Sequence, residues 1–78
     1  MTNLEKYKQA FTEALGISDD ETQSAKYQEQ KSWDSVGHMA LVAILEETFE
    51  IMMDTEDIID FSSFEKGKVI LRKYDVEL

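Results

Sequence analysis

The absence of proline, together with only three glycines in 78 residues, is the sequence feature that most constrains the fold. Both residues mark tight turns, so a chain this poor in them favours helices joined by short polar links over sheets with many hairpins. The length allows one domain, residues 1–78, and leaves no room for two lobes around an active-site cleft. We therefore expect an all-α fold.

The first helix is predicted over residues 3–15, because Thr2 and Glu5 have the spacing of a capping box and Gly16 follows as a C-terminal stop. Its inner face is expected to be largely aromatic. The residues that recur at helical intervals are Leu4, Tyr7, Phe11, Ala14 and Leu15.

A long polar connection follows over residues 17–33, where no helical period is sustained. Ser18 and Glu21 have the spacing to cap one short turn within it. Connections of this length in a compact domain are functional or flexible, and we expect Ile17, Tyr27 and Trp33 to fasten this one to the core.

The strongest helical pattern covers residues 35–49 and has two distinct faces. One face is assigned to the core and carries Leu41, Val42, Leu45 and Phe49. The opposite face mixes apolar side chains with carboxylates and carries Val36, Met39, Ala43, Glu46, Glu47 and Glu50.

Two further helices complete the predicted fold. A short third helix is expected over residues 55–60, and Ser62 with Glu65 is expected to cap a last helix. That helix carries Phe64, Lys68, Leu71 and Tyr74 at helical spacing, and Gly67 at a point where a side chain would prevent close contact. The prediction is thus a small four-helix bundle of three main helices and one short third helix.

Charge and composition exclude several classes of function. Seventeen acidic and eight basic residues give a net charge of −9, and no lysine or arginine lies between Lys31 and Lys66. Such a surface repels nucleic acid and anionic lipid, whereas apolar groups with an acidic rim suit a basic protein partner. No apolar run approaches the roughly 18 residues of a membrane span, so we expect a cytoplasmic protein without membrane insertion. The absence of cysteine excludes disulfides, thiolate zinc sites and a thiol nucleophile.

The segment Asp34-Ser35-Val36, followed by Glu46-Glu47, Phe49 and Ile51, resembles the acyl carrier protein family, including the peptidyl carrier domains. The three-letter motif is weak by itself. Its context adds specificity, because the acidic chain has a first helix ending in LGI, a long loop, a serine at a helix start and two further helices. The resemblance covers essentially the whole length.

The resemblance implies that Ser35 receives a 4′-phosphopantetheine group from coenzyme A, whose thiol carries an acyl group as a thioester. It also implies that Asp34 assists the phosphopantetheinyl transferase, and we expect Gly37 to leave the backbone open around the phosphate. The acidic and apolar face would dock on basic patches of acyl ligases, synthases and acyltransferases. On this interpretation the protein is a monomeric carrier, not an enzyme, and binds no metal.

Some residues depart from the family pattern. Ala40 stands where many members have an acidic residue, while Trp33 and Met52-Met53 replace smaller or different residues. These are either ordinary core substitutions or residues that shape a pocket for an unusual acyl group or against a long one. They favour a specialised acyl-transfer or biosynthetic pathway over central fatty acid biosynthesis, and the cargo stays open.

The same residues allow other interpretations of their roles. Ser35 by itself is a plain helix cap, and Ser35 with His38 has the spacing of a nucleophile and a base but lacks a third group and an oxyanion hole. Asp54 to Asp60 lacks the spacing of a calcium loop. The main alternative is an unmodified acidic interaction module that docks through Val36, Met39 and Ala43.

Overall fold

A computed structural model describes all residues 1–78 and contains five helices and no strand. The helices are α1 (Asn3–Leu15), α2 (Asp19–Thr22), α3 (Ser35–Phe49), α4 (Thr55–Asp60) and α5 (Phe64–Arg72). The all-α prediction is confirmed, and the bounds of α1, α3 and α4 agree with the predicted ones. The bundle has one helix more than predicted, because the turn capped by Ser18 continues as the short helix α2. No helix combines the length and apolar character needed to cross a bilayer.

Local side-chain caps explain where α1 and α2 begin. At α1, Thr2 Oγ1 accepts a hydrogen bond from the Glu5 N–H at 3.1 Å, and Glu5 Oε1 accepts one from the Thr2 N–H at 3.2 Å. The hydrogen bonds that Glu5 Oε1 accepts from the Thr2 N–H and hydroxyl stabilise the carboxylate and lower the pKa of Glu5. At α2 the Glu21 carboxylate likewise accepts hydrogen bonds from the Ser18 N–H and hydroxyl, but the Glu21 N–H donates to the Ser18 carbonyl.

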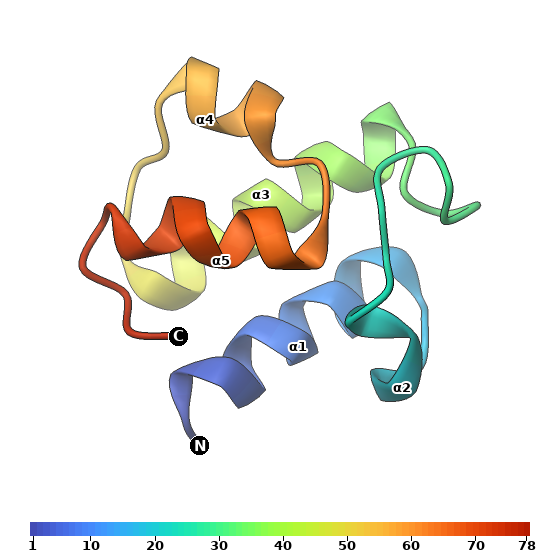
Figure 1. Cartoon of the computed structure of the whole chain (residues 1–78), viewed down its shortest axis with the longest axis horizontal. Helices are drawn as coiled ribbons and strands as arrows, with labels where there is room; N and C mark the ends of the chain where they lie inside the picture. The colour runs from blue at the N-terminus through green and yellow to red at the C-terminus, as the bar shows by residue number, and fades with distance from the viewer.

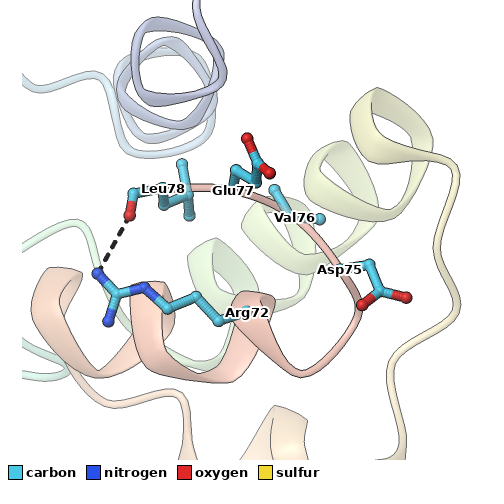
Figure 2. Close-up of a pocket in the computed structure, with 5 residues that line it drawn as sticks. All are labelled: Arg72, Asp75, Val76, Glu77 and Leu78. Atoms are coloured by element: carbon cyan, nitrogen blue, oxygen red, sulfur yellow. Dashed lines mark hydrogen bonds between the residues drawn. The ribbon is translucent and has the colours of Figure 1, made fainter.

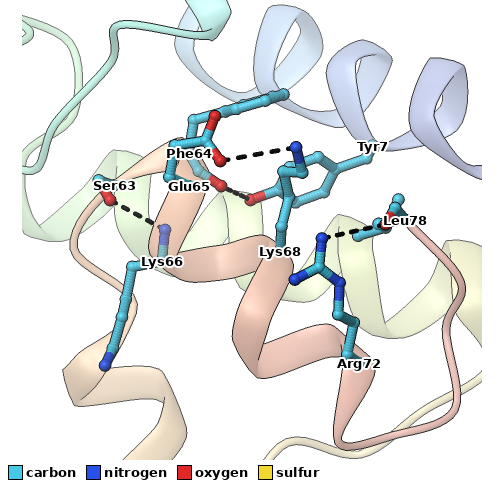
Figure 3. Close-up of polar contacts among 8 residues, drawn as sticks. All are labelled: Tyr7, Ser63, Phe64, Glu65, Lys66, Lys68, Arg72 and Leu78. Carbon is cyan, nitrogen blue, oxygen red and sulfur yellow. Dashed lines mark hydrogen bonds and ion pairs between the residues drawn. The ribbon is translucent and has the colours of Figure 1, made fainter.

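The predicted cap of α5 is wrong by one residue. Ser63, and not Ser62, is the cap, since its Oγ accepts a hydrogen bond from the Lys66 N–H at 3.0 Å (Figure 3). The Ser62 carbonyl instead accepts a hydrogen bond from the Tyr27 N–H at 2.8 Å. A contact with the distant loop therefore decides which of the two serines caps the helix.

The helices surround one core, with α1 and α3 packed together and the short α4 at the edge of the molecule (Figure 1). Sixteen buried apolar residues form this core, and they come from α1, α3, α5 and the connections. Leu4, assigned to the inner face of α1, is 37% exposed, while Ala10 is buried in that helix. Phe49, assigned to the core side of α3, is half-buried.

Five aromatic rings fill the centre of the core: Tyr7, Phe11, Trp33, Phe61 and Phe64. Phe11 is central among them, with its ring centroid 5.3 Å from that of Trp33 and 5.3 Å from that of Phe64, both in edge-to-face arrangements. The Tyr7 hydroxyl donates a buried hydrogen bond to the Phe64 carbonyl at 2.6 Å, and burial raises the pKa of Tyr7 (Figure 3). The cluster joins α1 to α5 and to the loop before α3.

The segment between α1 and α3, which includes α2, is fixed to the core at more points than the sequence indicated. Ile17 and Trp33 are buried as expected and Tyr27 is half-buried, but Thr22 and Ala25 are buried too. The Phe64 N–H donates a hydrogen bond to the Ala25 carbonyl at 3.2 Å, which holds the loop against the start of α5. The loop therefore places Trp33 in the core directly before α3.

Gly67 allows α5 to approach the aromatic cluster. A Cβ atom at this position would overlap the Tyr7 hydroxyl and the Phe61 ring. Tyr7 cannot move aside without losing its hydrogen bond to the Phe64 carbonyl. The prediction that a side chain would prevent close contact here is confirmed.

We predict that Gly67→Ala destabilises the protein by about 1–3 kcal/mol, the usual cost of overpacking a core. Denaturant unfolding monitored by circular dichroism measures this. Val69→Ala, at a half-exposed position of the same helix, is the control and should change stability much less. A gain in stability for Gly67→Ala, as expected for an unhindered helical glycine, would show that the contact is looser than described.

Candidate functional site

Ser35 is the first residue of α3 and is exposed. The cap of α3 is Asp34, whose Oδ1 accepts a hydrogen bond from the Gly37 N–H at 2.9 Å. The hydroxyl of Ser35 is therefore not needed for capping, and it makes no hydrogen bond in the structure. The simple interpretation of Ser35 as a helix cap is wrong.

The N-terminus of α3 offers favourable electrostatics for an anion on Ser35. The N–H groups of Ser35 and Val36 donate no hydrogen bond, while the next two are taken by Asp34. Free N–H groups and the helix dipole stabilise negative charge here by roughly 0.3–1 kcal/mol. Asp34 keeps its second carboxylate oxygen free of hydrogen bonds and is exposed.

Gly37 has a different role from the predicted one. It was expected to leave the backbone open around a phosphate, but it is buried. A Cβ atom there would overlap the Ser32 carbonyl oxygen and lie 3.1 Å from Leu15 Cδ2. Gly37 therefore allows the start of α3 to pack closely on the preceding loop and the end of α1.

An apolar cleft of about 310 Å³ opens beside Ser35, between α3 and α4. Five of its seven lining residues are hydrophobic, and the seven are Tyr27, Ser35, His38, Met39, Ile58, Ile59 and Phe61. Tyr27 and Ser35 are the two lining residues that carry a hydroxyl group. The cleft brings together Ser35 and Met39 from the predicted site with α4 residues to which the sequence analysis gave no role.

His38 forms part of the wall of the cleft and is held by hydrogen bonds at both ring nitrogens. Its Nδ1 accepts a hydrogen bond from Trp33 Nε1 at 2.9 Å, so its Nε2 carries the proton and donates to the Ile58 carbonyl at 2.7 Å. The half-buried packing histidine expected from the sequence is confirmed. Because Trp33 occupies the free lone pair of His38, that nitrogen cannot accept a proton from Ser35.

Asp57 anchors α4, the far wall of the cleft, to the end of α5. Its Oδ1 accepts a hydrogen bond from Lys73 Nζ at 2.6 Å, and its Oδ2 accepts a short one from the Tyr74 hydroxyl. The hydrogen bonds from Lys73 and then Tyr74 lower the pKa of Asp57, although partial desolvation opposes them. The sequence pattern did not indicate this cluster, because Asp57 has the position of an ordinary acidic residue in the first turn of a helix. Tyr74 was predicted to lie in the last helix, but it lies after the end of α5.

The face of α3 that was predicted to bind partners is exposed in its apolar part. Val36 is 78% and Met39 57% exposed, and Ala43 is exposed beside them. Ile59, which lines the cleft together with Met39, is exposed as well, although the sequence pattern did not indicate a role for it. Met52 and Met53 do not line the cleft, so their predicted role in shaping a pocket is not supported, and Met53 is buried.

The three carboxylates predicted on this face are not equivalent. Glu47 and Glu50 are exposed, but Glu46 is half-buried and its Oε2 accepts a hydrogen bond from the Met53 N–H at 2.9 Å. Glu46 thus holds the connection after α3 and is less free to meet a partner. Glu50 also ends α3, with a left-handed φ of 54°.

Positive and negative charges are separated between the helices. Neither α3 nor α4 contains a lysine or arginine, whereas α1 and α5 carry Lys6, Lys8, Lys66, Lys68 and Arg72. The side of the molecule formed by α3 and α4 is therefore strongly negative. Such a surface attracts cationic groups within the screening length of about 8–10 Å at ordinary ionic strength.

The largest pocket of the structure, of about 420 Å³, is elsewhere. It lies where the chain turns back after α5, and Arg72 Nη2 donates a hydrogen bond to the Leu78 carbonyl at 3.1 Å across it (Figure 2). Its lining mixes Arg72 with Asp75 and Glu77 and with two hydrophobic residues. It lies at the opposite side of the molecule from the start of α3 (Figure 1), so it plays no part in the Ser35 site.

We predict that the anchor of α4 weakens in acid. The pKa of Asp57 is lowered in the folded protein, so its contribution to stability is present above the unfolded pKa of about 3.9 and is lost as the pH falls through the folded value. Thermal unfolding from pH 7 to pH 2.5 should show this loss in the wild type and a smaller one in Asp57→Asn, which should be less stable at pH 7. Asp60→Asn removes a charge without hydrogen bonds from the same helix and serves as the control; equal profiles for the two variants would contradict the assignment.

Comparisons with known proteins add no assignment to this geometry. The chain matches no family model, no curated protein and no solved structure. The site is therefore defined by its own features: an exposed hydroxyl at the start of a helix, an apolar cleft beside it and a negative surface around it.

Proposed function

We propose that the protein is a carrier of the acyl carrier protein type, which holds acyl groups as thioesters on a 4′-phosphopantetheine arm attached to Ser35. The observation that carries this proposal is the Ser35 hydroxyl, which is exposed at the first position of α3, unneeded for capping and adjacent to an apolar cleft. The order of helices, with a long connection before the serine-bearing helix and a short helix before the last one, supports an acyl-carrier-like bundle.

The residues around Ser35 fit a phosphodiester. In the attachment step, the Ser35 oxygen forms a bond to the pantetheine-bearing phosphorus of coenzyme A, the diphosphate bond breaks and the adenine nucleotide leaves. The hydroxyl proton passes to a base of the transferase, because His38 has no free lone pair. The N–H groups of Ser35 and Val36 then stabilise the new negative charge.

The arm supplies a thiol, which this chain lacks, and forms the thioester that activates the cargo. The residues of the protein keep the arm at the surface and offer the cleft to the group it carries. Asp34 serves as the helix cap and, with its free carboxylate oxygen, assists the phosphopantetheinyl transferase. We propose a cytoplasmic monomer that serves a specialised acyl-transfer or biosynthetic pathway.

The partners of this carrier are a phosphopantetheinyl transferase and acyl ligases, synthases or acyltransferases with basic docking patches. The exposed Val36 and Met39 would meet apolar groups, and Glu47 and Glu50 would meet lysines and arginines. Such contacts between exposed charges are transient and sensitive to salt. That behaviour suits a protein that passes cargo between enzymes.

We predict that incubation with coenzyme A and a phosphopantetheinyl transferase adds one phosphopantetheine to the protein, visible by intact mass. Ser35→Ala should abolish the addition, because no other hydroxyl lies at the start of α3. Ser24→Ala, which changes an exposed serine outside the cleft, should be modified like the wild type. If several transferases add nothing to the wild type, the unmodified module that docks through Val36, Met39 and Ala43 becomes the better interpretation.

We predict that Glu47→Lys slows this modification by about tenfold or more at low salt without a matching loss of stability, since exposed charge pairs contribute only about 0–1 kcal/mol. Glu47 is chosen over Glu46 because Glu46 also accepts a hydrogen bond from Met53. The transferase rate at increasing salt measures the effect, and the difference between variant and wild type should shrink as salt rises. Glu77→Lys, at an exposed position after α5 and in a pocket that no α3 residue lines, makes the same change of charge, and an equal slowing there would argue against a docking site on α3.

A further inference from the structure

We propose that the cleft beside Ser35 admits apolar chains only up to medium length, because the Trp33–His38 pair closes its inner end. The inference rests on the proposed function for its biological meaning, but its physical content concerns only what a chain attached at residue 35 can reach. The cleft accepts a chain of up to medium length from Ser35, and a longer chain stays in solvent because it cannot enter the core.

The inner end of the cleft is built from rings that hold one another in place. His38 is fixed by its hydrogen bonds to Trp33 and Ile58, and its ring centroid lies 5.1 Å from that of Tyr27 and 6.1 Å from that of Phe61. A chain entering the core must displace His38, which would leave the Trp33 Nε1 proton and the Ile58 carbonyl without partners. Leaving a buried polar group unpaired is costly, so this end of the cleft resists opening.

Nothing behind these rings offers space. Trp33, Phe61, Phe11 and Phe64 are all at most 2% exposed and pack ring against ring, and all four pockets of the structure open to the surface. Well-packed interiors of this kind do not admit extra methylenes without strain. The cleft is therefore the only space in the protein that the attached chain can occupy.

The size of the cleft sets the length of the cargo. Its volume of about 310 Å³ lies at the lower end of the range of about 300–1,000 Å³ that ligand pockets show. It also opens to solvent along Ser35 and Met39, which are both exposed. A methylene group takes about 30 Å³, similar to the share of one water molecule in the liquid, so the cleft holds roughly ten methylenes. An octyl chain therefore fits this volume, and a longer fatty chain does not.

The test uses the absence of cysteine in the chain. Ser35→Cys provides one thiolate, which attacks the divalent, alkyl-bearing sulfur of an alkyl methanethiosulfonate. A mixed disulfide forms, and methanesulfinate leaves. Methyl, butyl, octyl and dodecyl chains are attached in this way, with no need for a transferase. The intact-mass experiment described above tests the proposed function, whereas only this series of alkyl conjugates tests the limit on chain length.

We expect the Tm to rise from the methyl through the butyl to the octyl conjugate by up to about 3–6 °C for each methylene that is buried, and to rise no further for dodecyl. The same chains on Ser24→Cys, outside the cleft, should give no rise. A Tm that keeps rising through dodecyl would overturn the inference, because the core would then admit the chain. The absence of any rise with butyl would overturn it as well, because the cleft would then hold nothing.

A second variant identifies the residues that set the limit. Trp33→Phe removes the proton donated to His38 and shortens the ring, so the inner end of the cleft becomes looser. In the double variant Ser35→Cys/Trp33→Phe, compared with its own methyl conjugate, we expect the rise in Tm to continue to dodecyl. A limit that stays at octyl would show that the Trp33–His38 pair does not determine it.

Discussion

The hydrogen bonds that run from Trp33 through His38 to the Ile58 carbonyl hold together the part of the molecule around the start of α3. Trp33 ends the long connection and is buried against Phe11, His38 belongs to α3, and Ile58 belongs to α4. One neutral imidazole thus joins three segments that have no continuous secondary structure between them. Because both ring nitrogens are used, the orientation of the ring is fixed, and with it the position of Ser35 one helical turn earlier.

Two anchors hold α4 from opposite sides. On one side the Ile58 carbonyl accepts a hydrogen bond from His38 Nε2, and on the other Asp57 accepts hydrogen bonds from Lys73 and Tyr74 at the end of α5. A helix of six residues has little stability by itself, so these contacts decide where it lies. The wall of the cleft is therefore made by tertiary contacts and not by helix propensity.

Local patterns in the sequence predicted most of the fold and part of the site. The bounds of α1 followed from Thr2, Glu5 and Gly16, because capping residues act on groups within four positions. The exposure of Val36 and Met39 followed from helical periodicity.

What the sequence did not predict depends on contacts between distant residues. Ser62 and Ser63 are both plausible caps, and the choice is made by the Tyr27 N–H, some 35 positions earlier. The pairing of Asp57 with Lys73 and the hydrogen bond from Met53 to Glu46 likewise leave no local pattern. Charge is distributed unevenly over the fold, because five of the eight lysine and arginine residues lie on α1 and α5, whereas α3 and α4 carry only anions. A cationic surface therefore exerts a torque that turns the side formed by α3 and α4 toward it before the two touch.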